Sequence, residues 1–255
     1  MGMGAIYDIE AGTDIAMVGL WDPASDGRPE LSHKELMPFL EAEAREGKLL
    51  LMITGGDGSY RAKVYVGERP AEASLAFFDR LGGEFYIESQ SGKLIFGGVE
   101  DYRHAEPRIT SEEDCFEVAA GCYSVDVFEC TLRVGGEDYY NELARRTSPE
   151  DVEHFRDASD GCASGCVLIL IGILLGYFFS WWWLLAGGVL GTAVANWSLR
   201  RQMADEVYQR VARAAMVLDG ELPEVIFVLD RVETMGESAG SFSLTGDGAV
   251  RAPRK

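Results

Sequence analysis

The stretch GCASGCVLILIGILLGYFFSWWWLLAGGVLGTAVANWSL, residues 161–199, decides how this chain is organised. Its thirty-nine residues include no Asp, Glu, Lys, Arg or His, which is typical of membrane spans rather than of helices in a water-soluble core. One helix of this length would extend about 58 Å, against a bilayer hydrocarbon core of about 30 Å. The stretch therefore predicts a hairpin of two short transmembrane helices.

The predicted hairpin turns near Ser180 and carries two sets of expected contact residues. Aromatic rings and arginines favour the membrane interface, so the expected interfacial anchors are Trp181, Trp182, Trp183, Trp197, Arg200 and Arg201. Small residues at four-residue spacing let helix backbones approach closely, within one hairpin or between copies of the chain in a homo-oligomer. These expected packing residues are Gly172, Gly176, Gly187, Gly191 and Ala195.

Arginines flank the apolar stretch on both sides, which favours two spans over one. The positive-inside rule then predicts that both termini are cytoplasmic, in a bacterial-type inner membrane. One alternative is a single tilted span. It requires residues 1–160 to lie outside, although the N-terminus MGMGAIYDIEAG shows no signal-peptide pattern. The other alternative is a helical hairpin buried inside a soluble protein.

Negative charge is concentrated before the apolar stretch. Residues 1–160 contain 33 acidic and 15 basic side chains, whereas residues 200–255 contain 9 and 8. An acidic domain repels nucleic acid and anionic lipid, so we expect no nucleic-acid partner and favour a basic protein partner. Solubility alone is the alternative explanation of the charge. The chain has five cysteines without a C-x-x-C pair, which fits reduced thiols.

Short apolar runs separated by turn residues predict a β-rich domain over residues 1–135. Two hairpins are expected, one around residues 55–59 and one around Ser91 and Gly92, with helices near residues 36–45 and 70–81. The run VIFVLDRV at residues 225–232 predicts a strand that packs back on this domain. The expected class is α+β, with a sandwich or open-barrel-like domain. The predicted parts are residues 1–135 (acidic β-rich domain), 136–160 (helical connector), 161–199 (transmembrane hairpin), 200–234 (amphipathic helix and strand) and 235–255 (flexible tail).

The densest group of polar side chains lies between two predicted strands, at residues 100–114. Loops that are held by a rigid sheet often carry binding residues. We therefore take Asp101, Tyr102, Arg103 and His104 as the candidate partner-binding loop. A solvated loop with local ion pairs is the alternative interpretation.

The sequence shows no catalytic constellation, since its three histidines lack metal-ligand spacing and no nucleotide-binding or nucleophile motif is present. We therefore expect no enzymatic activity, cofactor or metal. The leading hypothesis is a membrane-anchored binding protein whose acidic cytoplasmic domain binds a protein partner, in an immunity- or inhibitor-type role. The alternative is an effector in which the β-rich domain senses a signal and controls a bilayer-disrupting hairpin. An enzyme that uses the loop at residues 100–114 is a third hypothesis.

Overall fold

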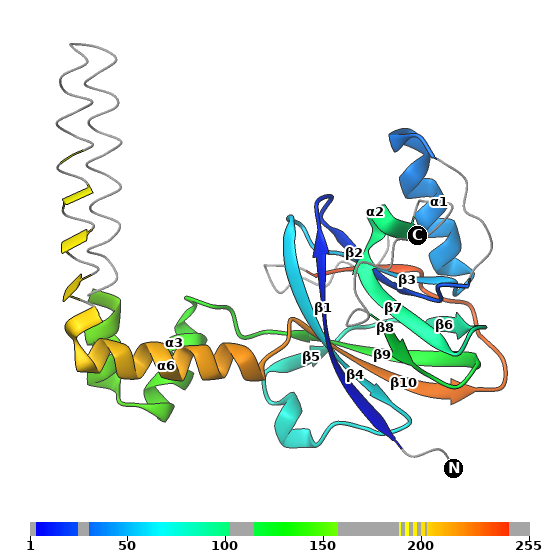
Figure 1. The fold of residues 1–255 in the computed structure, drawn as a ribbon. Helices are drawn as coiled ribbons and strands as arrows, with labels where there is room; N and C mark the ends of the chain where they lie inside the picture. The colour runs from blue at the N-terminus through cyan, green and yellow to red at the C-terminus, as the bar shows by residue number, and fades with distance from the viewer. Residues whose placement is uncertain are drawn as a thin grey trace, which may run out of the picture. The chain divides into compact units, whose positions relative to one another are not determined.

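The computed structural model describes residues 4–24, 31–102, 115–157 and 203–244, with a few further positions between residues 189 and 201. The chain divides into two compact units (Figure 1). The first, here called the β unit, consists of residues 1–131 and 223–255, and the second, the helical unit, of residues 132–222. The β unit is therefore built from two segments that the helical unit separates in sequence.

Two mixed sheets form the β unit. In sheet A the strand order is β1 (Ala5–Thr13), β4 (Gly58–Val66), β10 (Val225–Val232), β9 (Gly121–Cys130) and β5 (Phe78–Arg80), and β6 (Phe85–Ser89) also pairs with β9. In sheet B the order is β11 (Ser241–Ser243), β3 (Leu49–Ile53), β2 (Met17–Trp21), β7 (Lys93–Gly98) and β8 (Cys115–Glu117). The α+β class is as predicted.

The main core contains apolar side chains from both sheets. Successive side chains of a strand point to opposite faces, so every second residue of a strand can enter this core. Val125 and Val127 of β9 enter this core, as does Phe227 of β10. The ring of Phe227 meets that of Phe96 from sheet B, with 5.9 Å between the ring centroids. The side chains between these positions along β9 and β10 consequently point to the outer face of sheet A.

Helix α1 (His33–Arg45) packs against the other face of sheet B. Ser32 and Glu35 form the capping box that begins it. Its residues Leu36, Leu40 and Ala44, spaced by four, are buried in a second apolar cluster. That cluster also contains Trp21, Leu49, Leu51 and Ile95 from the sheet and Val99 and Tyr102 from the short helix α2 (Val99–Tyr102).

Both predicted hairpins are wrong, because the strands that flank each turn belong to different sheets. Residues 54–57 lead from β3 in sheet B to β4 in sheet A, and residues 90–92 lead from β6 in sheet A to β7 in sheet B. Gly55 and Gly92 adopt positive φ angles of 75° and 79°, which glycine tolerates. A glycine-rich turn predicts that the chain changes direction, but not that the next strand pairs with the previous one.

The predicted strand at residues 225–232 is present as β10, in the middle of sheet A. It runs parallel to β4 and antiparallel to β9. The backbone N–H of Cys130 donates to the carbonyl of Glu224 over 3.0 Å, so the end of β9 and the start of β10 lie side by side. The helical unit is thus inserted into what would otherwise be a β9–β10 hairpin connection.

The connection from β4 to β5, residues 67–77, crosses the outer face of sheet A, and we call it the strap. At its start the N–H of Gly67 donates to the carbonyl of Leu229 in β10, and at its end the carbonyl of Phe77 accepts from the N–H of Thr131 after β9. Since β4 and β5 lie on opposite sides of the β10–β9 pair, the strap has to pass over both strands. A helix at residues 70–81 was predicted here, but the structure has only the 3₁₀ turn η1 (Glu72–Leu75), because this segment contributes the edge strand β5 instead.

In the helical unit, α3 (Glu137–Arg146) packs against α6 (Glu206–Glu221). The Tyr139 hydroxyl donates to Asp219 over 2.8 Å, and burial together with this bond raises the pKa of Tyr139. Within the predicted helical connector, a further helix is present at residues 149–157, with the Ser148 hydroxyl accepting from the N–H of Asp151. The amphipathic helix predicted after residue 200 is interrupted at Asp205, which has extended backbone and caps α6.

The structure does not support the predicted transmembrane hairpin. No helix in the part of the chain that the structure describes is long and apolar enough to cross a membrane. The helices α3 and α6 are amphipathic and carry several charged side chains each. Residues 158–188, on which the prediction largely rests, lie outside the described residues. We therefore withdraw the transmembrane, helical-hairpin and inner-membrane assignments and the localisation with both termini cytoplasmic.

Candidate functional site

Of the predicted partner-binding loop, Tyr102 is a core residue. Its side chain is fully buried, with its ring centroid 5.6 Å from that of Trp21, and its hydroxyl donates to Glu43 over 2.7 Å. Asp101 belongs to α2, whereas Arg103 and His104 lie outside the described residues. Tyr102 thus anchors the start of the loop to α1, and the role of the four residues in binding stays a prediction.

The other predicted contact residues fall mainly outside the described part of the chain. Described among them are Trp197, Arg200 and Arg201. Trp197 is 63% exposed, and the guanidinium carbon of Arg201 lies 5.7 Å from the centroid of its ring. The set outside the description comprises Gly172, Gly176, Gly187, Gly191, Ala195, Trp181, Trp182 and Trp183.

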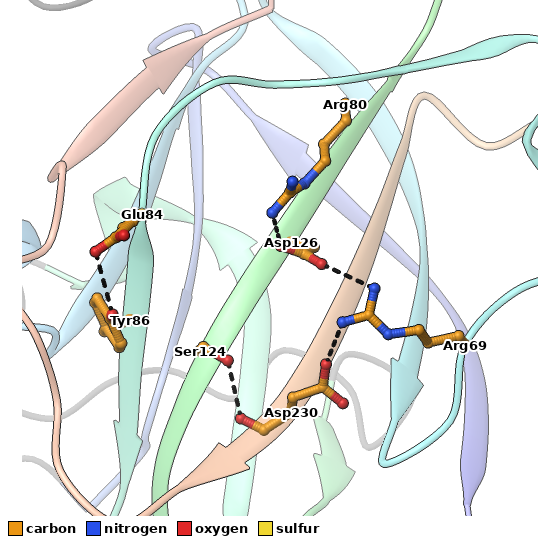
Figure 2. A network of polar contacts seen from close by, with 7 residues as sticks. All are labelled: Arg69, Arg80, Glu84, Tyr86, Ser124, Asp126 and Asp230. Carbon is orange, nitrogen blue, oxygen red and sulfur yellow. Dashed lines mark hydrogen bonds and ion pairs between the residues drawn. The ribbon is translucent and has the colours of Figure 1, made fainter.

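A network of charged side chains lies on the outer face of sheet A (Figure 2). Asp126 projects there from β9 because its neighbours Val125 and Val127 enter the core. Asp230 projects from β10 for the same reason, since Leu229 is a core residue. The strands are in register with Asp230 opposite Ser124, and the Ser124 hydroxyl donates to the backbone carbonyl of Asp230 over 3.2 Å. The two carboxylates are therefore fixed by the pairing of the two central strands.

Arg69, from the strap, bridges these two carboxylates. One terminal nitrogen of its guanidinium lies 2.7 Å from Asp230 Oδ2 and the other lies 3.3 Å from Asp126 Oδ2 (Figure 2). Arg80 of β5 binds the second oxygen of Asp126. The Asp126 side chain is only 20% exposed, whereas that of Arg69 is 65% exposed. The site is thus two half-buried carboxylates that receive a planar cation from the solvent side.

Apolar side chains lie beside this carboxylate pair. Val228 of β10 pairs in register with Asp126 on one side and with Tyr65 of β4 on the other. Val228 is 1% exposed and Tyr65 is 7% exposed, yet neither belongs to the core between the sheets. The two residues therefore form an apolar row on the outer face, beside Asp126.

One pattern in the sequence, which our prediction did not use, indicates that β10 is covered on its outer face. The run Val225–Leu229 is apolar at every position, and uninterrupted runs are typical of strands that are covered on both faces. Such a pattern indicates that something covers the outer face of β10. That the strap crosses this face follows only from the strand order.

The described residues include no group of three or more His, Cys, Asp or Glu side chains that could hold a metal ion. The chemistry that the site offers is recognition of a cation by two carboxylates. The expectation that the protein has no cofactor and is not an enzyme stays a prediction.

Comparison with known proteins adds little. No protein-family model matches the sequence, and no curated protein matches it. Among solved structures, one titled "Crocagin biosynthetic gene J" is similar at 14% sequence identity and a TM-score of 0.36. The match covers 51% of this chain and 80% of that chain. A similarity of this size supports no conclusion on fold or function.

Proposed function

We propose that this chain is a non-enzymatic binding protein whose acidic β unit binds a basic protein partner. The observation that carries the proposal is the charge of this unit, which holds 30 acidic and 15 basic side chains and so has a net charge of −15. The helical unit, with 12 acidic and 8 basic side chains, has a net charge of only −4. The negative potential that would attract a basic protein therefore arises from the β unit.

Most of the basic side chains that the structure describes in the β unit are already engaged within the unit, and are less available for contact with a partner. Of the nine lysines and arginines described in the unit, six form ion pairs with its own carboxylates. A seventh, Arg231, donates to the backbone carbonyl of Ala120. Carboxylates such as Glu72, Asp79 and Glu117 are exposed to solvent. Charged surfaces of this kind set the rate and the selectivity of association.

The bilayer-disrupting alternative depends on the transmembrane hairpin, which the structure does not support, and we do not propose it. An immunity- or inhibitor-type role is one form of the proposed binding function. It would require a basic partner whose activity falls when the two proteins associate.

A charge-reversal experiment tests the proposal. Partners are captured on the full-length protein at low salt, and the dissociation constant of each purified partner is measured as the salt concentration rises. Replacing Glu72, Asp79 and Glu117 by Lys should weaken binding of a basic partner about tenfold or more at low salt, mainly through slower association.

The matched control reverses three exposed carboxylates of the helical unit, Asp138, Glu150 and Glu153. It changes the net charge of the chain by the same amount, and we expect it to leave the affinity nearly unchanged. Capture of no basic partner, or binding that does not respond to salt, would contradict the proposal. Equal loss in both variants would show that net charge, and not the β unit, determines binding.

A further inference from the structure

We propose that Asp126 and Asp230 form a recognition site for an arginine of the partner, and that Arg69 of the strap occupies this site in the free protein. The inference rests on the proposed function, since it assumes that the partner is basic. The inference adds to that function the place of contact, the residue type that the site accepts, and a residue of the chain itself, Arg69, that competes for the site.

The first support is that the site already holds a guanidinium group. Its two carboxylates come from neighbouring strands, and each contacts a different terminal nitrogen of Arg69. Bidentate contact of this kind selects arginine over lysine, whose ammonium group cannot span two fixed acceptors in the same way. A partner arginine that approaches from solvent would meet the same two acceptors.

The second support is that the strap is held loosely over the site. Its ion pairs are largely exposed, and ion pairs of that kind contribute little net stability because water and salt screen them. The 3₁₀ turn in its middle contains no buried residue. Ala71, Ala73 and Ala76 are exposed as well. Among the described residues, the backbone hydrogen bonds from the strap to the sheet lie at its two ends, at Gly67 and Phe77, so the middle can move away without separating the strands of the sheet.

The third support is what lies next to the carboxylates. Val228 and Tyr65 form an apolar row beside Asp126, and both are almost fully buried in the free protein. If Arg69 moved away, the site would present two carboxylates with Arg80 as the remaining cation, next to these two apolar residues. This combination fits an extended segment in which an arginine is adjacent to aliphatic side chains.

Displacing Arg69 costs free energy, so the free protein should bind such a segment more weakly than a variant in which the site is empty. The apparent dissociation constant rises in inverse proportion to the fraction of molecules with an open site. Removal of Arg69 should therefore increase affinity, which is the opposite of what loss of a contact residue would do.

The test uses the full-length chain and the peptide acetyl-Ser-Val-Arg-Val-Ser-amide, titrated by NMR with the backbone amides of β9 and β10 as reporters. Arg69→Ala should bind the peptide about tenfold more tightly than wild type, with the largest shifts near Asp126, Val228 and Asp230. Adding Asp230→Asn to this variant should abolish the gain. A peptide with citrulline in place of arginine, which keeps the shape without the charge, should not bind.

Two controls make the result decisive. Arg45→Ala removes a comparably exposed ion pair with Glu41 on α1, away from the strap, and should bind the peptide like wild type. Arg69→Gln keeps part of the side-chain stem and removes the charge, and it replaces Arg69→Ala if that variant unfolds. Equal peptide affinity in wild type and both Arg69 variants would overturn the inference, as would a gain that survives Asp230→Asn.

The experiments distinguish failure of the arginine site from failure of the proposed function. If the arginine peptide does not respond to Arg69 but the Glu72, Asp79 and Glu117 reversals still weaken binding of a basic partner, the function stands and the arginine site is refuted. If the reversals have no effect, the proposed function fails whatever the peptide shows.

Discussion

A chain that ends at residue 222 is expected to lose the fold of the β unit, because it lacks the central strand of sheet A. β10 pairs with β4 on one side and with β9 on the other, so its removal leaves both strands without a partner on their inner edges. Its first five residues, Val225–Leu229, are each at most 2% exposed. Burial of such side chains is worth about 1.5–3 kcal/mol each, so their sum is of the order of a whole domain's stability.

Hydrogen exchange of the amides in β4 and β9 measures this loss. In the chain that ends at residue 222 we expect no protection at these amides and no cooperative urea transition of the β unit. A chain that ends at residue 244 keeps β10 and β11 and is the matched control, for which we expect the protection of the full-length protein. Persistent protection in the shorter chain would mean that β10 is not a structural part of the sheet.

The second large effect is expected at Asp22, the most deeply buried carboxylate among the described residues. It is 3% exposed and accepts hydrogen bonds from the N–H of Ala24 over 2.6 Å, the N–H of Ser91 over 2.8 Å and the hydroxyl of Ser89 over 3.0 Å. It thereby ties the end of β2 to the turn after β6. Asp22→Ala leaves these donors without the charged acceptor, and we expect it to lower the free energy of unfolding by about 2–4 kcal/mol.

Urea unfolding at neutral pH checks this value. Asp79→Ala, which removes an exposed carboxylate from β5, is the control and should change stability by less than about 0.5 kcal/mol. A loss at Asp22 no larger than at Asp79 would show that the three hydrogen bonds do not stabilise the fold.

The Asp22 effect should also depend on pH. Burial alone would raise the pKa of Asp22, but the hydrogen bonds from Ser91, Ala24 and Ser89 outweigh burial and leave the pKa below its ordinary value of 3.8. A lowered pKa in the folded state stabilises the protein above the unfolded-state pKa, and this contribution is lost as the pH falls. The stability difference between wild type and Asp22→Ala should therefore be constant above about pH 5 and shrink below about pH 4.

The sequence predicted individual elements better than their arrangement. The strand expected at residues 225–232 and the helix expected near residues 36–45 are present as β10 and α1, because each depends on local pattern. The two glycine-rich turns predicted hairpins that do not exist, since pairing between sheets is decided by the core and not by the turn. β1 was missed, because its residues alternate with charged side chains and pack only in the context of β4.

The candidate site was beyond the reach of local patterns for the same reason. Arg69, Asp126 and Asp230 are far apart in sequence, and each belongs to a segment that has no motif of its own. Only the order β4–β10–β9–β5 brings them together, because it forces the strap across the two strands that carry the carboxylates. The loop at residues 100–114 attracted the prediction through its density of polar residues, but Tyr102, at its start, is part of the core.

Residues 1–131 and 223–255 should form one self-sufficient fold that builds the carboxylate pair from both segments. The most direct test joins Thr131 to Pro223 through a four-residue loop containing Asn and Gly, in place of the helical unit, and records hydrogen exchange in β9 and β10. The adjacency of Cys130 and Glu224 predicts that this shortened chain folds and protects these amides as the full-length protein does. A shortened chain without protected amides in β9 and β10 would contradict the claim.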